Sequence, residues 1–248
     1  MENYIDYNIT VTSSDIDLWG YLRPTAILAI LQEAAYLHSE QRRMGVDALH
    51  EQNVTWVLSR VRVEAERLPE LHERIRVRTW HKGQSKESGL FSLRDFIIYD
   101  SEDRAIIRAT SSWLVINIET RRITRIDKLF SGDSTLSRLV YQGDAIQSEA
   151  ERVNPLSDGQ AVGEHRVLYS DIDINQHVNN TKYLEWACDH APQSMESQNR
   201  FKTLTINFNH EAKYGELVTL RSTPQHPNRV QIEGVIEKRS IFTLTLEY

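Results

Sequence analysis

Apolar residues follow a helical spacing in two regions of the chain. After Pro24 they recur at intervals of three and four positions, which predicts an amphipathic helix with this proline in its first turn. We expect Gly45 to end that helix. A shorter apolar stripe covers residues 183–191 and predicts a second helix, with Asn180 as its N-cap.

Runs of apolar residues with strand character follow each predicted helix and are separated by turn-forming residues. These runs predict four strands in each half of the chain. They cover about residues 55–66, 75–81, 90–99 and 105–118 in the first half, and about residues 202–209, 216–221, 229–238 and 241–247 in the second. A helix followed by a meander of antiparallel strands, present twice, predicts an α+β fold in which each helix packs on one sheet face.

The chain contains an internal repeat. Ser14–Leu28 realigns without a gap on Ser170–Leu184, so equivalent residues lie 156 positions apart, and both copies contain the sequence Asp-Ile-Asp. Two copies at this distance predict two similar domains and not a solenoid of short repeats. We expect residues 1–130 to form the first domain, residues 131–160 a linker, and residues 161–248 the second domain.

The two copies diverge directly after the shared Asp-Ile-Asp. The first continues from Asp17 as Leu-Trp-Gly-Tyr, whereas the second continues from Asp173 as Ile-Asn-Gln-His and so introduces Asn175 and His177. Histidine can move protons near neutral pH, a neighbouring carboxylate can orient it, and an amide can polarise a carbonyl. A polar turn with capping residues explains the same cluster. The first copy makes its turn without these residues, which favours a catalytic site in the second.

Composition argues against several classes of protein. The 248 residues include 29 basic and 35 acidic ones, a net charge of −6, which does not suit a nucleic-acid-binding protein. The single cysteine, Cys188, cannot form an internal disulfide, and the nine histidines lack the spacing of metal ligands. No apolar run reaches the roughly 18 residues of a membrane-spanning helix, and the N-terminus does not resemble a signal peptide. We expect a cytoplasmic protein without a metal.

The second copy also resembles the signature of a known family. The stretch Asp173-Ile-Asn-Gln-His-Val-Asn-Asn-Thr-Lys-Tyr-Leu-Glu-Trp186 is similar to that of the acyl-acyl-carrier-protein thioesterases of plants and their bacterial relatives. Asn53–Arg60 and Thr79–Lys82 resemble N-terminal segments of the same family, so the resemblance covers nearly the whole chain. It implies a double hot-dog fold, in which two tandem helix-on-antiparallel-sheet domains form a pseudo-dimer. The absence of a plant transit peptide suggests the bacterial branch.

The resemblance further implies hydrolysis of the thioester that joins a fatty acyl chain to the phosphopantetheine arm of acyl carrier protein, in fatty acid synthesis and without a cofactor. The family's catalytic residues carry over to Asp173, Asn175 and His177, and its glutamate falls on Glu211. Plant relatives tend to have cysteine after that glutamate, whereas this chain has Ala212, which excludes a cysteine nucleophile there. We expect Asn175, together with the amides at the start of the helix near Asn180, to polarise the thioester carbonyl, and Glu211 or His177 to activate water. Asp173 would orient its neighbours or, alternatively, attack the thioester and form a mixed anhydride.

Acyl carrier proteins are acidic, so their docking surface should be locally basic. The candidate clusters are Arg42–Arg43 and the group of Arg121, Arg122, Arg125 and Lys128, although a solvated surface run is the simpler explanation of each. The alternative functions are an acyl-CoA thioesterase, a dehydratase, which the whole-chain match disfavours, and a non-catalytic acyl-binding module. Two fused halves can satisfy each other's sheet edges, so the sequence is compatible with a monomer or a homodimer.

Overall fold

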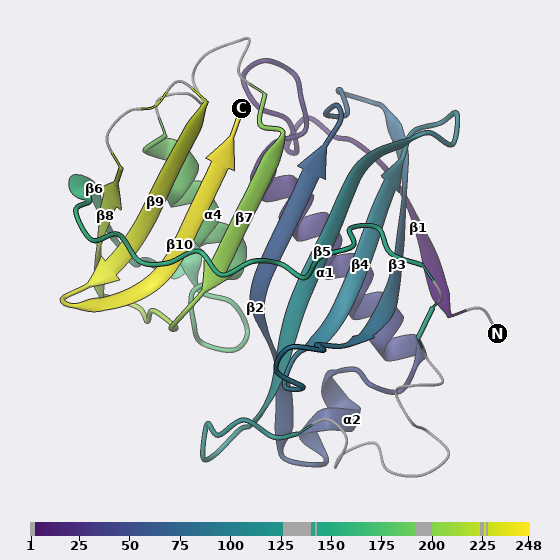
Figure 1. The fold of residues 1–248 in the computed structure, drawn as a ribbon, viewed down its shortest axis with the longest axis horizontal. Helices are drawn as coiled ribbons and strands as arrows, with labels where there is room; N and C mark the ends of the chain where they lie inside the picture. The colour runs from purple at the N-terminus through teal and green to yellow at the C-terminus, as the bar shows by residue number, and fades with distance from the viewer. Residues whose placement is uncertain (1–2, 126–139, 142, 192–199, 224–225, 227) are drawn as a thin grey trace.

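The chain forms one ten-stranded antiparallel sheet with its two long helices on the same side (Figure 1). The computed structural model describes residues 3–125, 140–141, 143–191, 200–223, 226 and 228–248. The first half comprises β1 (Tyr4–Thr10), α1 (Pro24–Gln41), α2 (Val46–His50), β2 (Val54–Ala65), β3 (Arg74–Gln84), β4 (Ser92–Tyr99) and β5 (Ala105–Asn117). The second half comprises β6 (Gln160–Arg166), α4 (Asn180–Asp189), β7 (Thr203–Phe208), β8 (Leu217–Ser222), β9 (Arg229–Ile236) and β10 (Arg239–Glu247).

The two halves of the sheet match each other strand for strand. From the centre outward, the first half runs β2-β5-β4-β3-β1 and the second runs β7-β10-β9-β8-β6. The halves join where β2 pairs with β7, from Arg60 opposite Asn207 to Glu64 opposite Thr203. The repeated helix-on-sheet unit confirms the expected α+β class, and the central pairing makes one continuous sheet of the two units.

The apolar faces of α1 and α4 pack with the sheet in one hydrophobic core that extends through both halves. Leu31 of α1 and Leu184 of α4 are 2% and 0% exposed. Full burial of a leucine side chain contributes about 2 kcal/mol, so many such residues hold the helices in place. The helices also contact each other, and the Asn180 side chain donates to Gln32 Oε1 (3.2 Å). The N-terminus of α4 therefore lies beside α1.

The ends of both helices differ from the expectation. Helix α1 has Pro24 in its first turn as expected, but it ends at Gln41, and Gly45 is instead the N-cap of α2. Glu40 accepts a hydrogen bond from Val46 N (3.0 Å), which ties the end of α1 to the first turn of α2. The N-cap of α4 is Asn179, not Asn180, because the Asn179 side chain accepts from Thr181 N (2.9 Å).

Part of the expected linker crosses the sheet on the side opposite the helices (Figure 1). Asp95 of β4 accepts from Ala145 N (2.7 Å), and Asn207 of β7 accepts from Val153 N (2.7 Å). The segment thus supplies backbone partners to buried polar groups of both halves. No helix of the described residues is long and apolar enough to cross a membrane.

Candidate active site

The turn before α4 positions the first three candidate residues. Asp173 N donates to His177 O (2.9 Å), and Gln176 N donates to Asp173 O (3.0 Å), with Gln176 in the left-handed region at φ 64°. Just before the turn, Asp171 is 4% exposed and accepts from Leu168 N (2.7 Å) and from His165 Nε2 (2.9 Å). The turn is therefore tied to the core on one side and to α4 on the other.

Asp173 and Asn175 form one polar pair. Asp173 Oδ1 accepts from Asn175 N (2.8 Å), and Oδ2 lies 3.4 Å from Asn175 Nδ2. Asparagine Nδ2 carries two hydrogens, so one of them stays available to a substrate oxygen while the other faces the carboxylate. Asn175 is exposed, which makes that hydrogen accessible from solvent.

His177 and Glu211 form the second polar pair. Glu211 lies in the loop that follows β7, and its Oε2 is 3.1 Å from His177 Nε2. The next residue, Ala212, is 0% exposed and donates its N–H to Tyr183 Oη (2.9 Å), while its carbonyl accepts from Val178 N (3.1 Å). These bonds hold the Glu211 backbone against both the turn and α4.

The carboxylate that contacts His177 therefore belongs to Glu211, whereas Asp173, which we expected to orient its neighbours, contacts Asn175. The Asp173 carboxylate instead closes the turn on the amides of Asn175, a local bond that aspartate readily makes. Within the residues that the structure describes, no side-chain hydrogen bond links the two pairs. The structure thus offers one oriented amide and one imidazole–carboxylate pair, the groups needed to polarise a carbonyl and to move a proton.

The N-terminus of α4 contributes less than expected. Thr181 N donates to the Asn179 side chain (2.9 Å), and Lys182 N donates to Asn179 O (2.9 Å). These two amides are already satisfied, so they are poor donors to an oxyanion. Asn175 is the better placed donor.

Two further expectations concern Cys188 and the basic clusters. Burial raises the pKa of the Cys188 thiol to about 12, so this residue stays protonated and is no nucleophile. Arg121, a member of one expected docking cluster, forms an ion pair with Glu211 Oε1. No local sequence pattern indicates this contact, because the two residues lie 90 positions apart. Lys128 of the same cluster lies outside the described residues.

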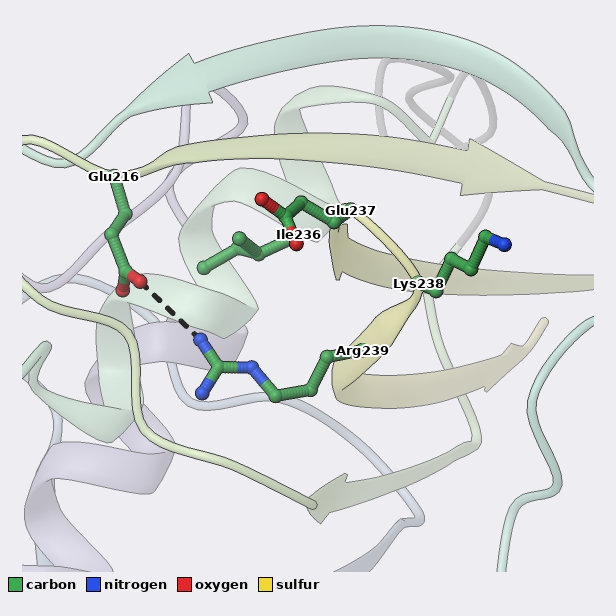
Figure 2. A pocket seen from close by; sticks show the side chains of 5 residues that line it. All are labelled: Glu216, Ile236, Glu237, Lys238 and Arg239. Carbon is green, nitrogen blue, oxygen red and sulfur yellow. Dashed lines mark hydrogen bonds and ion pairs between the residues drawn. The ribbon is translucent and has the colours of Figure 1, made fainter.

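Two surface hollows lie away from the candidate residues. One has a volume of about 410 Å³ and is lined by Glu216 and by residues 236–239, with Arg239 paired to Glu216 at 3.3 Å (Figure 2). The other, of about 630 Å³, is lined in part by Tyr21, Leu68 and Arg200. No candidate catalytic residue lines either hollow. Over the described part of the chain, no group of three or more His, Cys, Asp or Glu side chains could hold a metal ion.

Comparison with known proteins places the chain among thioesterases. The palmitoyl-acyl carrier protein thioesterase of Gossypium hirsutum is 30% identical over 215 residues, which is 82% of this chain and 51% of that protein. The oleoyl-acyl carrier protein thioesterase 2 of Arabidopsis thaliana is 25% identical over 221 residues, 82% of this chain and 58% of that protein. The chain thus spans between half and three fifths of the length of these relatives.

Solved structures share the fold. An acyl-ACP thioesterase from Bacteroides thetaiotaomicron superposes with a TM-score of 0.88 at 24% identity, covering 99% of this chain and 97% of that one. The 12:0-ACP thioesterase from Umbellularia californica superposes with a TM-score of 0.87 at 20% identity, covering 100% and 97%. These superpositions confirm the double hot-dog fold.

Models of the family itself cover most of the chain. Residues 2–131 match the acyl-ACP thioesterase N-terminal domain, and residues 156–243 match the acyl-ACP thioesterase C-terminal domain. The chain therefore belongs to the acyl-ACP thioesterase family.

Proposed function

We propose that this protein hydrolyses the thioester of fatty acyl-acyl carrier protein and releases the free fatty acid. The observation that carries the proposal is the 3.1 Å contact between His177 Nε2 and Glu211 Oε2, in a chain of this family. An imidazole in contact with a carboxylate is a suitable general base for water. The names of the relatives add acyl carrier protein as the thiol carrier and a fatty acyl chain as the acid.

The reaction proceeds in two steps. Asn175 Nδ2 donates to the thioester carbonyl, and the His177–Glu211 pair takes a proton from water as its oxygen bonds to the carbonyl carbon. The tetrahedral oxyanion then collapses, the C–S bond breaks, and the proton passes from the pair to the departing thiolate. The products are the fatty acid and the free phosphopantetheine thiol, with no group left on the enzyme.

Attack by water is favoured over attack by Asp173. Both oxygens of the Asp173 carboxylate face the amides of Asn175, at 2.8 and 3.4 Å, which lowers their availability as nucleophiles. A single turnover in ¹⁸O-labelled water separates the two routes. Label should enter only the fatty acid, and label in an enzyme carboxylate would show the mixed-anhydride route instead.

The purified chain can be tested with one panel of acyl groups of varied length, each attached to acyl carrier protein and to CoA. We expect release of free fatty acid, with a kcat/KM at least about tenfold higher for the carrier-bound substrates, because a carrier adds a protein–protein contact that CoA lacks. Higher turnover on CoA would make the protein an acyl-CoA thioesterase. Binding of acyl carrier protein without product release would identify a non-catalytic module.

A further inference from the structure

Arg121 comes from the first half of the chain, yet it reaches the candidate site in the second. It lies on the turn that follows β5, and its guanidinium pairs with Glu211 Oε1. The other oxygen of the same carboxylate, Oε2, lies 3.1 Å from His177 Nε2. Glu211 thus bridges an arginine and a histidine, one on each oxygen.

The turn that carries Arg121 is rigidly built. The Asn117 side chain accepts from both Thr120 N (2.8 Å) and Thr120 Oγ1 (2.9 Å), and it donates to Asn53 O (3.1 Å). Arg121 N donates to Asn117 O (3.0 Å), and Arg121 itself adopts φ 57°, a left-handed conformation that is unfavourable for a residue with a side chain. Such strain persists only where the surrounding bonds impose it, and it is common at functional sites.

Stability does not account for this contact. The side chains of Arg121 and Glu211 are 47% and 38% exposed, and ion pairs this exposed contribute little to folding. The geometric effect is larger, because the Arg121 guanidinium on Oε1 restricts rotation of the carboxylate while Oε2 contacts the imidazole. A carboxylate held in this way is oriented before substrate arrives.

We propose that Arg121 is a positioning residue, supplied by the first half, that holds the Glu211 carboxylate against His177. This inference rests on the proposed hydrolase function and names a further member of the same site. It also separates Arg121 from its neighbour Arg122, which is exposed and makes no ion pair within the described residues. The two arginines therefore form a matched pair for experiment.

The first test compares Arg121→Ala with Arg122→Ala. We expect kcat of Arg121→Ala to fall about ten- to a hundredfold, since displacement of a catalytic group by about 1 Å has effects of this size, with KM changed less than about threefold. Arg121→Lys should recover part of the loss, because lysine keeps the charge but not the planar guanidinium. Arg122→Ala should leave kcat unchanged. A loss confined to KM and shared by both alanine variants would show a docking contact and overturn the proposal.

The second test asks whether Arg121 acts through Glu211. In a Glu211→Gln background, the additional Arg121→Ala change should lower kcat less than about twofold, whereas independent roles would multiply the two losses. The melting temperature of Arg121→Ala should stay within about 3 °C of the unmodified protein, as expected for an exposed ion pair.

A crystal structure of Arg121→Ala distinguishes failure of this inference from failure of the proposed function. We expect the Glu211 carboxylate to move out of hydrogen-bond reach of His177, whether or not the protein turns over any thioester. An unchanged His177–Glu211 contact in the variant would overturn the positioning role. Absence of hydrolysis by the unmodified protein would instead refute only the proposed activity.

Discussion

The turn before α1 and the turn before α4 share one backbone but carry different chemistry. Asp17 N donates to Tyr21 O (2.8 Å), as Asp173 N donates to His177 O (2.9 Å). The side chain of the same aspartate also accepts from the backbone N–H two residues further along, at 2.8 Å in both turns. The aspartate and the backbone bonds are enough to form the turn, so the remaining side chains are free to differ between the halves.

The residues packed beside the two turns also differ in chemistry. Leu22 N donates to Pro69 O (2.7 Å) as Val178 N donates to Ala212 O, so Leu68 occupies the place that Glu211 takes in the second half. Leu68 is 6% exposed, and Arg200 lies over the Tyr21 ring at 4.1 Å. The first half thus buries an apolar side chain where the second half holds a histidine against a carboxylate. The two halves therefore share a backbone scaffold, and the second half has the His177–Glu211 pair where the first half has Tyr21 and Leu68.

The largest expected effect comes from substituting the equivalent residues His177 and Tyr21 one at a time. His177→Ala removes the imidazole of the candidate base and should lower kcat about 10²- to 10⁴-fold, the range of general-base catalysis. Tyr21→Phe changes the equivalent residue but keeps its ring under Arg200, so kcat should change less than about twofold. Steady-state release of fatty acid from acyl carrier protein measures both. Equal losses in the two variants would mean that the first-half turn also takes part in the reaction.

The repeat and the apolar patterns predicted both long helices and the eight strands from β2 to β5 and from β7 to β10. The pattern missed the two outer strands, β1 and β6, whose residues are largely exposed or half-buried and lack a continuous apolar run. It also placed the helix caps at Gly45 and Asn180, because a sequence does not show which of several neighbouring residues makes the capping bond.

The candidate site was only partly predictable for a similar reason. The resemblance identified Asp173, Asn175, His177 and Glu211 as a set. Their division into two pairs depends on rotamers and on the loop after β7. The Arg121 contact depends on how the two halves pack together, and local sequence patterns do not predict which distant side chains come into contact. Long-range partners follow from the pairing of β2 with β7, which the sequence analysis did not specify.

The second prediction concerns the stability of the protein in acid, which should depend on two buried histidines of the first half. His38 and His81 of the first half are 1% and 6% exposed, and burial, with the charge of nearby Arg94, lowers the pKa of each to about 3. Below about pH 6.5 these histidines bind protons in the unfolded chain but stay neutral in the folded protein. The free energy of unfolding should therefore fall by about 2–3 kcal/mol per pH unit between pH 6 and 4.

Urea unfolding at pH 7 and at pH 5 measures this loss. His81→Gln keeps an amide that can bond to Ser92, the partner of the His81 ring at 2.8 Å, and cannot titrate. Its stability should depend less steeply on pH than that of the unmodified protein. An identical pH dependence would assign the acid sensitivity to other groups.

The smallest expected effect lies at one equivalent position of the two turns. Gly20 has φ 85° and Gln176 has φ 64°, so both occupy the left-handed region, but only the first copy uses the residue that adopts it without strain. A Cβ added at Gly20 would meet nothing within 4 Å, so Gly20→Ala tests backbone conformation alone. It should lower the free energy of unfolding by about 1 kcal/mol.

Gln176→Gly should have the opposite sign and a smaller size. It relieves the left-handed strain but adds freedom to the unfolded chain, so we expect a gain of about 0.5 kcal/mol at most, measured by urea unfolding. Because the Gln176 side chain makes no hydrogen bond or ion pair to the candidate pairs among the described residues, kcat should stay within about twofold. A marked loss of kcat in the more stable variant would show that strain in this turn, and not only its side chains, distinguishes the second half from the first.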